Sequence, residues 1–550
     1  MKKKALAFAA AACAFGMLLS GCGSSNGDST ADKGSNVVTA YNSEPQNPLI
    51  PGDCNETGGG KPLDLLFARL ISFDAKGNAS NEVAESIEAN DNATQYTIKL
   101  KDGWKFTDGT PVTAESFTKA WSYTANAKNA QLGSSFFSTI KGYDALQDGD
   151  KLKGDEQLEG LKVVNDKEFT VDLNQSDSVF AIKVGYTAFA PLPESFFKDP
   201  KAFGEKPVGN GPYKFQSWDH DNQIVLVKNP DYKGNRVPKN DGVTFKVYTK
   251  DEAAYADIQS GSLDVMESVP ASATKTFEKD STVQAYNKAG SVIQQFTIPS
   301  NVKHFEAGTE EGTLRRQAIS MAINRQNICD KVLNGTGTPA ADFTSPLTPG
   351  YSDSLTGSDN LKYNEKKAKE LWDKANAISP WTADDKLTFA YNADGGHEVI
   401  YTAVVNSINN VLGDGVAATN PYPTFNDFRT AVSDRKVNGA FRSGWQPDYP
   451  SAENYLMQNF ASSAADGNGS NDGDYKNSKF DDLCNQAAAS KTTDDANKLY
   501  QKAQEVLLND LPAVPLYYAN AYGVASTGVS GFEMNWQNLP VYENMTKSGK

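Results

Sequence analysis

The sequence predicts an α/β protein that contains more than one domain. At 550 residues, the chain is longer than a single hydrophobic core usually organises. Its 39% apolar and 22% charged residues are typical of a globular protein. Along the chain, short stretches in which apolar and polar residues alternate, as in strands, are interspersed with stretches whose apolar residues recur at helical spacing.

The first half of the chain shows this alternation from its start. Residues 37–41 read V-V-T-A-Y, which favours a strand, and the S-E-P-Q-N-P segment at 43–48 ends it. Residues 63–71 have apolar side chains at helical spacing, and Thr113 suits the start of a helix that continues through Trp121. We expect a further helix at 253–258, and strands at 95–100, 223–228, 243–248 and 263–266.

The second half of the chain continues the same pattern. Residues 314–332 place Ala318, Ile319, Ala322 and Ile323 on one face, which predicts one long helix. We expect further helices at 368–375, 403–412, 425–432 and 499–508, and strands at 387–391 and 514–518.

Residues 439–456 read G-A-F-R-S-G-W-Q-P-D-Y-P-S-A-E-N-Y-L and concentrate the chemistry of a binding site. A cation, an anion and two aromatic rings fall within eight positions, at Arg442, Trp445, Asp448 and Tyr449. The two prolines favour extended backbone, which offers donors and acceptors along one edge. This combination suits an extended zwitterionic ligand. The alternative is a surface turn in which Arg442 and Asp448 form a salt bridge, a contact that contributes little to stability.

Composition and charge argue against several functions. The net charge is −15 and the pI is about 4.9, so the phosphates of a nucleic acid would be repelled. The three histidines, His220, His304 and His397, are far apart in the sequence, which leaves little material for metal or acid–base chemistry. No H-E-x-x-H motif and no nucleophile motif in a strand–turn–helix context occurs. We therefore expect no catalytic residues, no metal and no cofactor.

The first residues predict export and lipid anchoring. Three lysines precede an apolar run at 5–19 that is short for a membrane span, and L-S-G-C at 19–22 resembles a lipobox. This pattern predicts a signal peptide at 1–21, a diacylglycerol anchor on the Cys22 thiol, a fatty acid such as palmitate on its amine, and a flexible tether at 22–36. The chain would then sit outside the cytoplasm on the outer face of the bacterial cell membrane. The alternative is an ordinary secretory signal with an incidental cysteine.

Three cysteines remain after Cys22: Cys54, Cys329 and Cys484. Three thiols cannot all pair, and their wide spacing gives no metal-binding motif. At least one is expected to be a buried free cysteine, and the pairing of the others stays open.

Four separated stretches resemble one protein family. They are F-T-D-G-T-P-V-T-A-E-S-F at 106–117, G-N-G-P-Y-K-F-Q-S-W at 209–218 with V-K-N-P-D-Y at 227–232, L-R-R-Q-A-I-S-M-A-I-N-R at 314–325, and R-S-G-W-Q-P-D-Y-P at 442–450. Together they resemble the extracellular solute-binding proteins, family 5, of bacterial ABC importers for oligopeptides and dipeptides. Their order and spacing cover nearly the whole chain after the signal peptide.

The resemblance implies an architecture of the periplasmic-binding-protein type, with two lobes that close on a ligand and an extra domain inserted in the first lobe. Carried onto this sequence, lobe I comprises 37–62, 193–290 and 515–550, the extra domain 63–192, and lobe II 291–514. It also implies a non-enzymatic monomer that delivers its ligand to an ABC permease, whose ATPase subunits lie in the cytoplasm.

The resemblance also assigns site residues. Asp448, the aspartate of G-W-x-x-D-Y, is expected to hold the α-ammonium of a peptide, and Arg442 the carboxylate of a short peptide. Backbone at Ser443, Gly444 and Trp445, and at Ser43, Glu44 and Pro45 on the first lobe, is expected to flank the peptide as strands. Pro45 has no N–H to donate, which weakens that side of the assignment. Trp445 and Tyr449 are expected to wall the cavity.

Two other functions remain as alternatives. The same scaffold serves receptors for oligosaccharides or other solutes, because a fold does not fix its ligand. The charged pair at Arg442 and Asp448 favours a peptide, since neutral sugars need no buried charges. The third hypothesis is a surface lipoprotein enzyme, such as a peptidase or glycosidase. The sequence contains no recognisable catalytic motif to support it.

Overall fold

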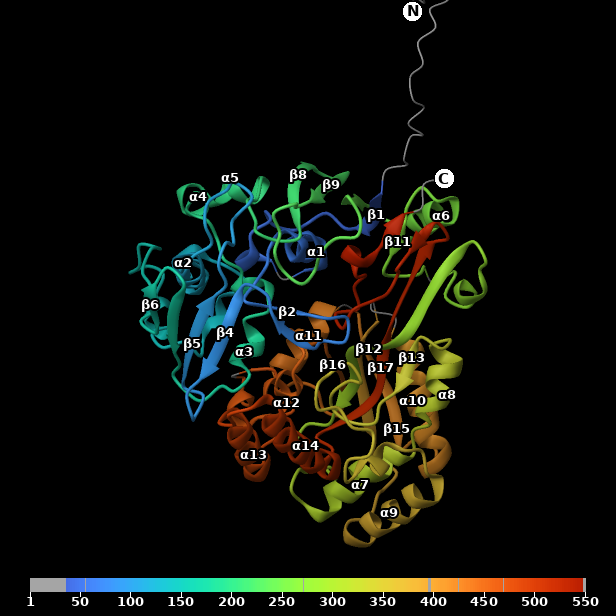
Figure 1. Cartoon of the computed structure of the whole chain (residues 1–550). Helices are drawn as coiled ribbons and strands as arrows, with labels where there is room; N and C mark the ends of the chain where they lie inside the picture. Colours follow the sequence, from blue (N-terminus) through green and yellow to red (C-terminus); the bar gives the residue numbers. More distant parts are fainter. Residues whose placement is uncertain are drawn as a thin grey trace, which may run out of the picture.

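The computed structural model describes residues 36–54, 56–270, 272–393, 397–423, 425–467 and 469–547. The predictions for the signal peptide, for Cys22 and for the tether up to residue 35 lie outside the described residues. The rest of the chain forms an α/β structure with two lobes and an extra domain beside the first lobe (Figure 1).

One large mixed sheet extends through both lobes. Its strand order is β15-β14-β16-β12-β17-β11-β1-β10-β9-β8, and β13 pairs with β17. The lobe I strands are β1 (Val37–Asn42), β8 (Tyr213–Asp219), β9 (Gln223–Lys228), β10 (Gly242–Val247) and β11 (Val265–Met266). The lobe II strands are β13 (Gly337–Pro339), β14 (Leu387–Asn392), β15 (Ala417–Tyr422) and β16 (Ala440–Trp445).

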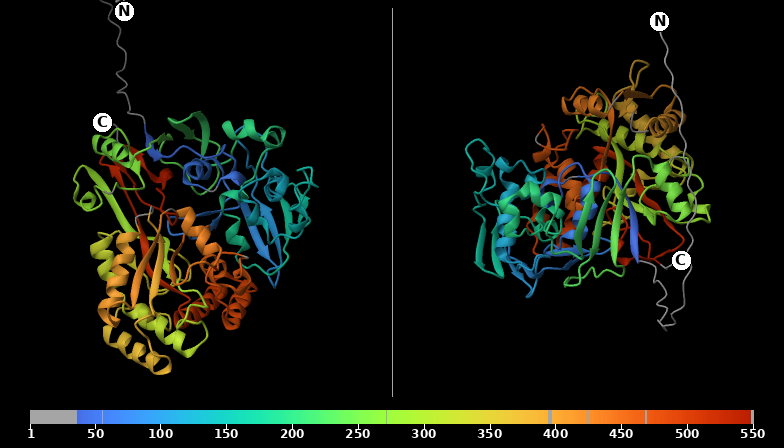
Figure 2. Two further views of the ribbon diagram at one scale, coloured as in Figure 1. Left: turned by 180° about the vertical axis from the view of Figure 1, so that it is seen from behind. Right: turned by 90° about the horizontal axis from the view of Figure 1, so that it is seen from above.

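Two long antiparallel strands, β12 (Val283–Thr297) and β17 (Ala513–Ser526), join the lobes. At one end β17 pairs with β11 of lobe I, and at the other end β12 pairs with β16 of lobe II. Figures 1 and 2 show these strands running from one lobe into the other. The predicted residue limits of the lobes and the extra domain stay predictions, because the sheet passes between the lobes without a break.

A β-bulge interrupts the β12–β17 pairing between Ala289 and Val292. Gly290 lies in this bulge, where a Cβ would stand 2.6 Å from the Ala519 carbonyl oxygen. Groups from both sides meet there. Tyr455 of lobe II donates its hydroxyl to the Ser291 carbonyl at 2.6 Å, and the Asn538 side chain accepts the Ser291 N–H at 3.4 Å. The bulge is therefore a place where the connection between the lobes departs from regular pairing, and a second register shift follows between Gln294 and Gln295.

Lobe I carries α1 (Thr57–Leu66) and α6 (Asp251–Ser260) beside its strands. The Glu56 side chain caps α1 by accepting the N–H groups of Gly58 and Gly59. Gly261 ends α6 with a positive φ of 75°, a conformation that favours glycine. The last segment of the chain returns to lobe I as β18 (Val529–Ser530) and β19 (Thr546–Lys547), and Asn36 accepts the N–H of Lys547 at 2.8 Å.

The extra domain contains a four-stranded antiparallel sheet in the order β4 (Ala84–Ala89), β5 (Gln95–Leu100), β7 (Glu168–Asp172), β6 (Leu161–Asn165). Helix α2 (Ala114–Ala125) packs on it, and Trp121 of α2 lies fully buried among aromatic rings. Thr113 and Ser116 form the capping box that starts α2, so the predicted helix start is confirmed. The remaining elements of this part of the chain are β2 (Ile71–Phe73), β3 (Ala79–Asn81) and α3 (Phe180–Lys183). Helices α4 (Glu194–Lys198) and α5 (Pro200–Glu205) follow, within the range predicted for lobe I.

Eight helices of the described chain belong to lobe II. They are α7 (Glu310–Met321), α8 (Arg325–Asn327), α9 (Glu365–Ile378), α10 (Glu398–Leu412), α11 (Phe425–Ser433), α12 (Ala452–Phe460), α13 (Ser478–Ala488) and α14 (Thr493–Asp510). Single 3₁₀ turns lie at Pro51–Asp53, Ala127–Asn129, Ser134–Phe137, Asp144–Leu146, Thr187–Phe189, Phe277–Lys279, Ser358–Leu361, Ser462–Ala464 and Tyr542–Asn544, and a π turn at Ile328–Val332.

Two predicted helices are wrong in part. The helix expected at 63–71 ends at Leu66, because the Asn210 side chain bonds both the N–H and the carbonyl of Ala68 at 2.9 and 3.0 Å and holds the chain extended. The helix expected at 314–332 breaks after Met321. There the buried guanidinium of Arg325 donates to the carbonyls of Pro515 and Ser320, which fixes a turn between α7 and α8.

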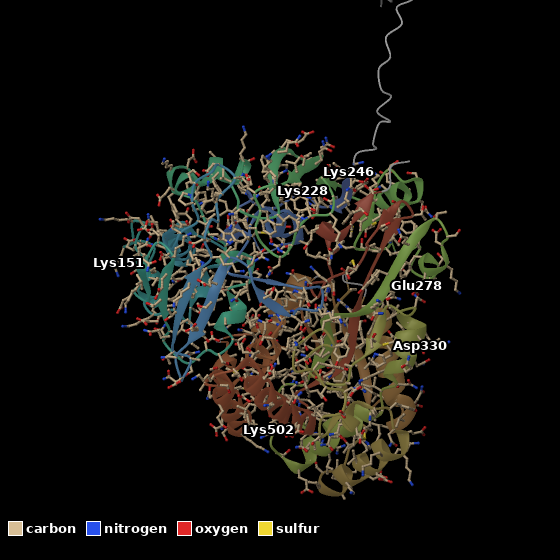
Figure 3. All side chains as sticks on the ribbon, viewed as in Figure 1. Lys151, Lys228, Lys246, Glu278, Asp330 and Lys502 are labelled. Atoms are coloured by element: carbon tan, nitrogen blue, oxygen red, sulfur yellow. The ribbon has the colours of Figure 1, made fainter. Side chains whose placement is uncertain are left out.

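The surface is polar, and the described thiols are free. Figure 3 shows Lys151, Glu278, Asp330 and Lys502 on the outside of the molecule. Among the described residues, no helix is long and apolar enough to cross a membrane, and no cluster of three His, Cys, Asp or Glu side chains is arranged to hold a metal. Cys329 and Cys484 are buried and Cys54 is half-buried, all three unpaired, which confirms the expected buried free cysteine.

Candidate functional site

The candidate site begins where strand β16 ends. Ala440 and Phe441 are buried and anchor β16 between β12 and β14. The Q-P-D-Y-P segment that follows turns the chain, and Ser451 caps helix α12 by accepting the N–H of Glu453 at 3.2 Å. Asp448 therefore lies between a strand end and a helix start, where ligand sites of α/β sheets are common.

Asp448 is a half-buried carboxylate without a cationic partner among the described residues. Its Oδ2 accepts a hydrogen bond of 3.0 Å from the side-chain amide of Asn454, and its own N–H donates to Asn454 Oδ1 at 3.0 Å. Burial raises the pKa of Asp448, and the bond from Asn454 only partly opposes this shift. The carboxylate is thus left without a compensating positive charge in the described part of the chain.

Asp448 faces a cavity of about 500 Å³ between the extra domain and lobe II. Phe136 of the extra domain lines it and lies against Tyr186, with ring centroids 4.3 Å apart. Burial raises the pKa of Tyr186, and the negative charge of Asp448 raises it further. An apolar aromatic wall and one free carboxylate are suited to an organic cation.

A buried charge cluster closes one side of this cavity. Lys183 Nζ lies 2.7 Å from Asp177 Oδ2 and 3.7 Å from Glu453 Oε1. Burial alone would lower the pKa of Lys183, but Asp177 and Glu453 raise it above its ordinary value. Tyr449, expected as a cavity wall, is buried and donates its hydroxyl to Glu453 at 2.5 Å. It therefore contributes to the contact between the extra domain and lobe II as well as to the cavity.

Arg442 lies on the same strand as Trp445 but lines a different cavity, of about 310 Å³, together with Ser443, Gly444 and Trp445. The described residues hold no ion pair between Arg442 and Asp448, so the surface salt bridge considered as the alternative is not formed. Arg442 Nε is buried with no acceptor. Burial raises the pKa values of Tyr401 and Tyr517, and the nearby charge of Arg442 opposes both shifts.

Ser43, Glu44 and Pro45 follow strand β1 on lobe I. Glu44 Oε1 lies 2.8 Å from Nδ1 of His220, and Glu44 Oε2 accepts the N–H of Asp221 at 3.0 Å. Ser43 is exposed and Pro45 is buried. Ser43 and Glu44 line a third cavity, of about 460 Å³. The predicted residues of the two lobes therefore do not share one cavity in this structure.

Several side chains at the site were not predicted from the sequence. Asn454 orients Asp448, and it also accepts the indole N–H of Trp445 at 2.8 Å. Tyr186 and Lys183 come from the extra domain, far from Asp448 in the sequence. The one local signal in the sequence was the position of Asn454, six residues after Asp448. No sequence pattern indicated the contacts from the extra domain.

Comparisons with known proteins agree with this architecture. Residues 78–467 match the family described as bacterial extracellular solute-binding proteins, family 5 Middle. The oligopeptide-binding protein OppA of Bacillus subtilis is 26% identical and aligns over 94% of this chain and 95% of its own length. The heme-binding protein A of Haemophilus influenzae is 24% identical over 88% and 87%.

The fold agrees with that of a solved structure. The unliganded open form of the murein tripeptide-binding protein MppA superposes with a TM-score of 0.81 at 23% identity, over 94% of this chain and 98% of that one. The predicted fold class, a two-lobe clamshell with an extra domain, is confirmed.

Proposed function

This chain belongs to the bacterial extracellular solute-binding proteins of family 5, and we propose that it captures oligopeptides between its lobes and delivers them to an ABC importer. As a member of that family it binds a solute and is not an enzyme. Peptide as the ligand, the roles of the site residues and the lipid anchor belong to the proposal.

The observation that carries the peptide proposal is the free carboxylate of Asp448. A half-buried carboxylate without a cation costs free energy, which a bound ammonium group recovers. The α-ammonium of a peptide provides that charge and three N–H donors. Tyr186 and Phe136 then cover the first residue of the peptide from the side of the extra domain.

Arg442 is the proposed partner for the carboxylate of a short peptide. Its Nε has no acceptor in the described structure, so the guanidinium keeps a donor for an anion. The peptide backbone would run along Ser443, Gly444 and Trp445 on lobe II and along Ser43, Glu44 and Pro45 on lobe I. Main-chain hydrogen bonds of this kind give affinity without reading side chains.

We propose that lobe closure assembles the two sides of the site. Ser43 and Glu44 line a cavity that is separate from those of Asp448 and Arg442. The β12–β17 pair connects the lobes, and its bulge at Gly290 is the proposed hinge. A ligand held by both lobes favours the closed arrangement because only there does it make all its contacts.

The first residues support the proposed location. With a signal peptide at 1–21 and a lipid-modified Cys22 carrying palmitate, the protein is held on the outer face of the bacterial cell membrane as a lipoprotein. Its proposed partners are an ABC permease and the ATPase subunits in the cytoplasm, which it serves as a monomer. Mass spectrometry of the membrane-extracted protein tests this, because an unmodified Cys22 would exclude the anchor.

A receptor for another solute is the second candidate, because a relative named for heme binding is about as similar as the peptide-binding one. Oligosaccharides are a further possibility for the same fold. A neutral sugar carries no charged group that would pair with Asp448 or with Arg442. Calorimetry with a peptide library, a panel of oligosaccharides and heme tests this. Binding of peptides alone supports the proposal, and binding of sugars or heme alone contradicts it.

A further inference from the structure

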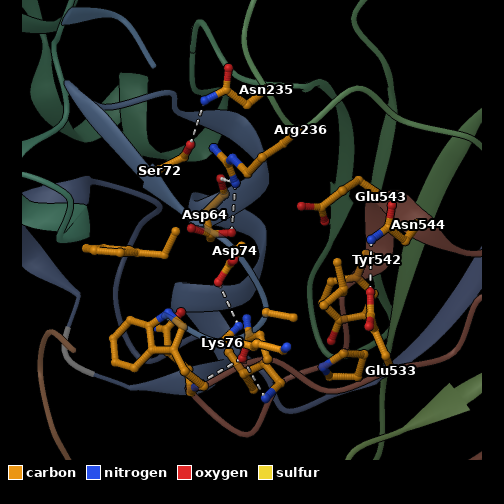
Figure 4. Close-up of a pocket in the computed structure, with 18 of the residues that line it drawn as sticks. Asp64, Ser72, Asp74, Lys76, Asn235, Arg236, Glu533, Tyr542, Glu543 and Asn544 are labelled. Carbon is orange, nitrogen blue, oxygen red and sulfur yellow. Dashed lines mark hydrogen bonds and ion pairs between the residues drawn. The ribbon is translucent and has the colours of Figure 1, made fainter. Parts of the chain in front are cut away.

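Another large cavity lies where lobe I meets the β2–β3 hairpin, away from Asp448 and Arg442. It has a volume of about 580 Å³, within the range of small-molecule sites. Its walls are helix α1, the β2–β3 hairpin, the segment around Asn235 and Arg236, and the C-terminal segment from Glu533 to Asn544 (Figure 4). None of the residues assigned to the peptide site lines it.

Most charges around this cavity are paired. Asp64 accepts from Arg69 Nη2 at 2.7 Å and from Arg236 Nη1 at 3.0 Å. Arg236 Nε also donates to Glu82 at 3.2 Å, and Lys61 forms an ion pair with Glu267. Burial would raise the pKa of Asp64, but Arg236 and Arg69 lower it overall. These contacts fix the walls in place.

Glu543 is the exception. Its backbone carbonyl accepts the N–H of Lys239 at 2.8 Å, but in the described structure its carboxylate has no cation within ion-pairing distance. Figure 4 shows this carboxylate directed across the cavity towards Asp64 and Arg236, without an interaction that joins it to either. Burial raises its pKa, and the positive charge of Arg236, which lies beyond ion-pairing distance, opposes this shift only in part.

A count of the buried and half-buried charges gives the sign of the missing partner. Five carboxylates outnumber three buried cations here. The carboxylates are those of Asp64, Glu82, Glu267, Glu533 and Glu543, and the cations are Lys61, Arg69 and Arg236. The cations pair with Asp64, Glu82 and Glu267, so the excess charge is negative and lies on Glu533 and Glu543. Glu533 accepts a hydrogen bond of 3.0 Å from the Asn544 amide, which leaves Glu543 as the carboxylate that no other side chain of the described residues bonds.

Two further buried polar groups at the cavity lack a hydrogen-bond partner among the described residues. Tyr542 is 3% exposed, and its hydroxyl has no hydrogen-bond partner among the described residues. Arg69 is almost as buried, and its Nε has no acceptor, although Asp64 balances its charge. Both residues line the cavity. Buried polar groups in native structures are normally satisfied, so the Tyr542 hydroxyl, which can accept a hydrogen bond from an ammonium group, points to an occupant.

Phe73 and Trp536 supply the apolar part of the wall. Their rings meet edge to face, with centroids 5.5 Å apart, and both residues line the cavity. We propose that this cavity is a second ligand site, which binds a small organic cation through the Glu543 carboxylate and the Phe73–Trp536 wall. An ammonium or guanidinium group is the recognised part, and this binding is independent of the peptide site.

The test uses the full chain that carries Asp448→Asn, so that the peptide site does not hold the probe's ammonium group. The probe is 2-phenylethylammonium, and its neutral analogue is 2-phenylethanol. Titration calorimetry is expected to give saturable binding of the cation with one site per chain, at least tenfold tighter than that of the alcohol. Glu543→Gln is expected to weaken binding of the cation at least tenfold and to leave the melting temperature near that of its parent.

Glu252→Gln is the matched control. Glu252 is exposed on α6, and its replacement by glutamine removes the same charge from the chain as Glu543→Gln does. It should leave binding of the cation unchanged. Equal binding of cation and alcohol, or unchanged binding in Glu543→Gln, overturns the proposal. So does the absence of saturable binding by the cation. None of these results bears on Asp448, whose role is tested with peptides.

Discussion

Asn454 holds Asp448 through two hydrogen bonds of 3.0 Å, one from its amide to the carboxylate and one to its carbonyl from the Asp448 N–H. The same carbonyl oxygen accepts the indole N–H of Trp445 at 2.8 Å. One buried asparagine thus orients the two residues that the motif R-S-G-W-Q-P-D-Y-P brings to the site.

Replacing this asparagine should loosen the site and the fold together. In Asn454→Ala, three hydrogen bonds are lost, and we expect the free energy of unfolding to fall by about 1–3 kcal/mol. We also expect peptide affinity to fall about tenfold, because a carboxylate that is no longer oriented binds an ammonium less well. Denaturant unfolding and calorimetry measure the two effects.

Asn240→Ala provides the control for this experiment. Asn240 is also buried and bonds Tyr213 and the carbonyls of Tyr542 and Met545, but it lies in lobe I outside the peptide site. It should lower stability without changing peptide affinity. If Asn454→Ala behaves in the same way, Asn454 has no role in positioning Asp448.

Arg442→Ala should affect peptides according to their length and their C-terminus. Only a peptide of the right length brings its carboxylate to the guanidinium, and a charged hydrogen bond contributes about 1.5–3 kcal/mol. For that length, amidation of the C-terminus should weaken binding about tenfold or more in the unmodified protein and leave binding to Arg442→Ala unchanged.

Arg429→Ala is the control here, because Arg429 lines the same cavity but is paired with Asp472 at 2.9 Å. It should retain the sensitivity to amidation. Equal losses for every peptide length in Arg442→Ala would contradict a role in binding the carboxylate.

Two ion pairs between the extra domain and lobe II should differ in their contribution to stability. Lys183 is buried with Asp177 and Glu453, so Lys183→Met leaves unpaired buried carboxylates and should cost about 3–5 kcal/mol. Lys491 pairs with Asp91 on the surface at 2.9 Å, and Lys491→Met should leave the melting temperature nearly unchanged. Thermal unfolding of both variants gives the comparison, and similar losses would contradict it.

Asp342 should make stability depend on pH. Its carboxylate is fully buried, and burial raises its pKa to about 6 although Thr344 donates to it. An unfolded aspartate titrates near pH 4, so between about pH 4 and 6 the folded protein holds a proton that the unfolded chain has released. The stability contribution of this group therefore falls as pH rises through that range, by about 3 kcal/mol in total.

Asp342→Asn carries no charge at this position and should lose that part of the pH dependence. Relative to the unmodified protein, it should gain stability at pH 7 and gain much less at pH 4. Unfolding in denaturant at both pH values measures this. The same difference in stability between the two variants at both pH values would contradict the assignment.

Much of the fold was readable from local patterns. Strand β9 spans 223–228 as predicted, because its apolar side chains alternate towards the core. Strand β14 begins at Leu387 as predicted, although it is buried on both faces from Phe389 to Asn392. The strand β12 escaped prediction because its polar sequence and Gly290 resemble a loop. It is extended because β17 and β16 pair with it. Strand β6 escaped because its face is exposed, with Val164 58% accessible.

The residues of the candidate site also fall into two groups, those that a local motif indicated and those that only tertiary contacts bring to the site. Arg442, Trp445 and Asp448 follow one another in a single motif, so the sequence placed them at a strand end together. Lys183 lines the cavity of Asp448, and Tyr186 packs against Phe136 of that cavity. Both positions depend on the packing of the extra domain on lobe II, through contacts such as the hydrogen bond of 2.8 Å from Ser178 Oγ to the Ala487 carbonyl. Tertiary contacts of this kind leave no trace in local spacing.

The most direct test of the account is a calorimetric comparison of one peptide with a free and an acetylated amino terminus, on the unmodified protein and on Asp448→Asn. If Asp448 holds the α-ammonium, acetylation weakens binding to the unmodified protein about 100-fold or more, since breaking such a pair costs about 3–5 kcal/mol. Asp448→Asn should bind both peptides equally weakly. Tight binding of the acetylated peptide to the unmodified protein, or an undiminished preference for the free peptide in Asp448→Asn, would contradict the account.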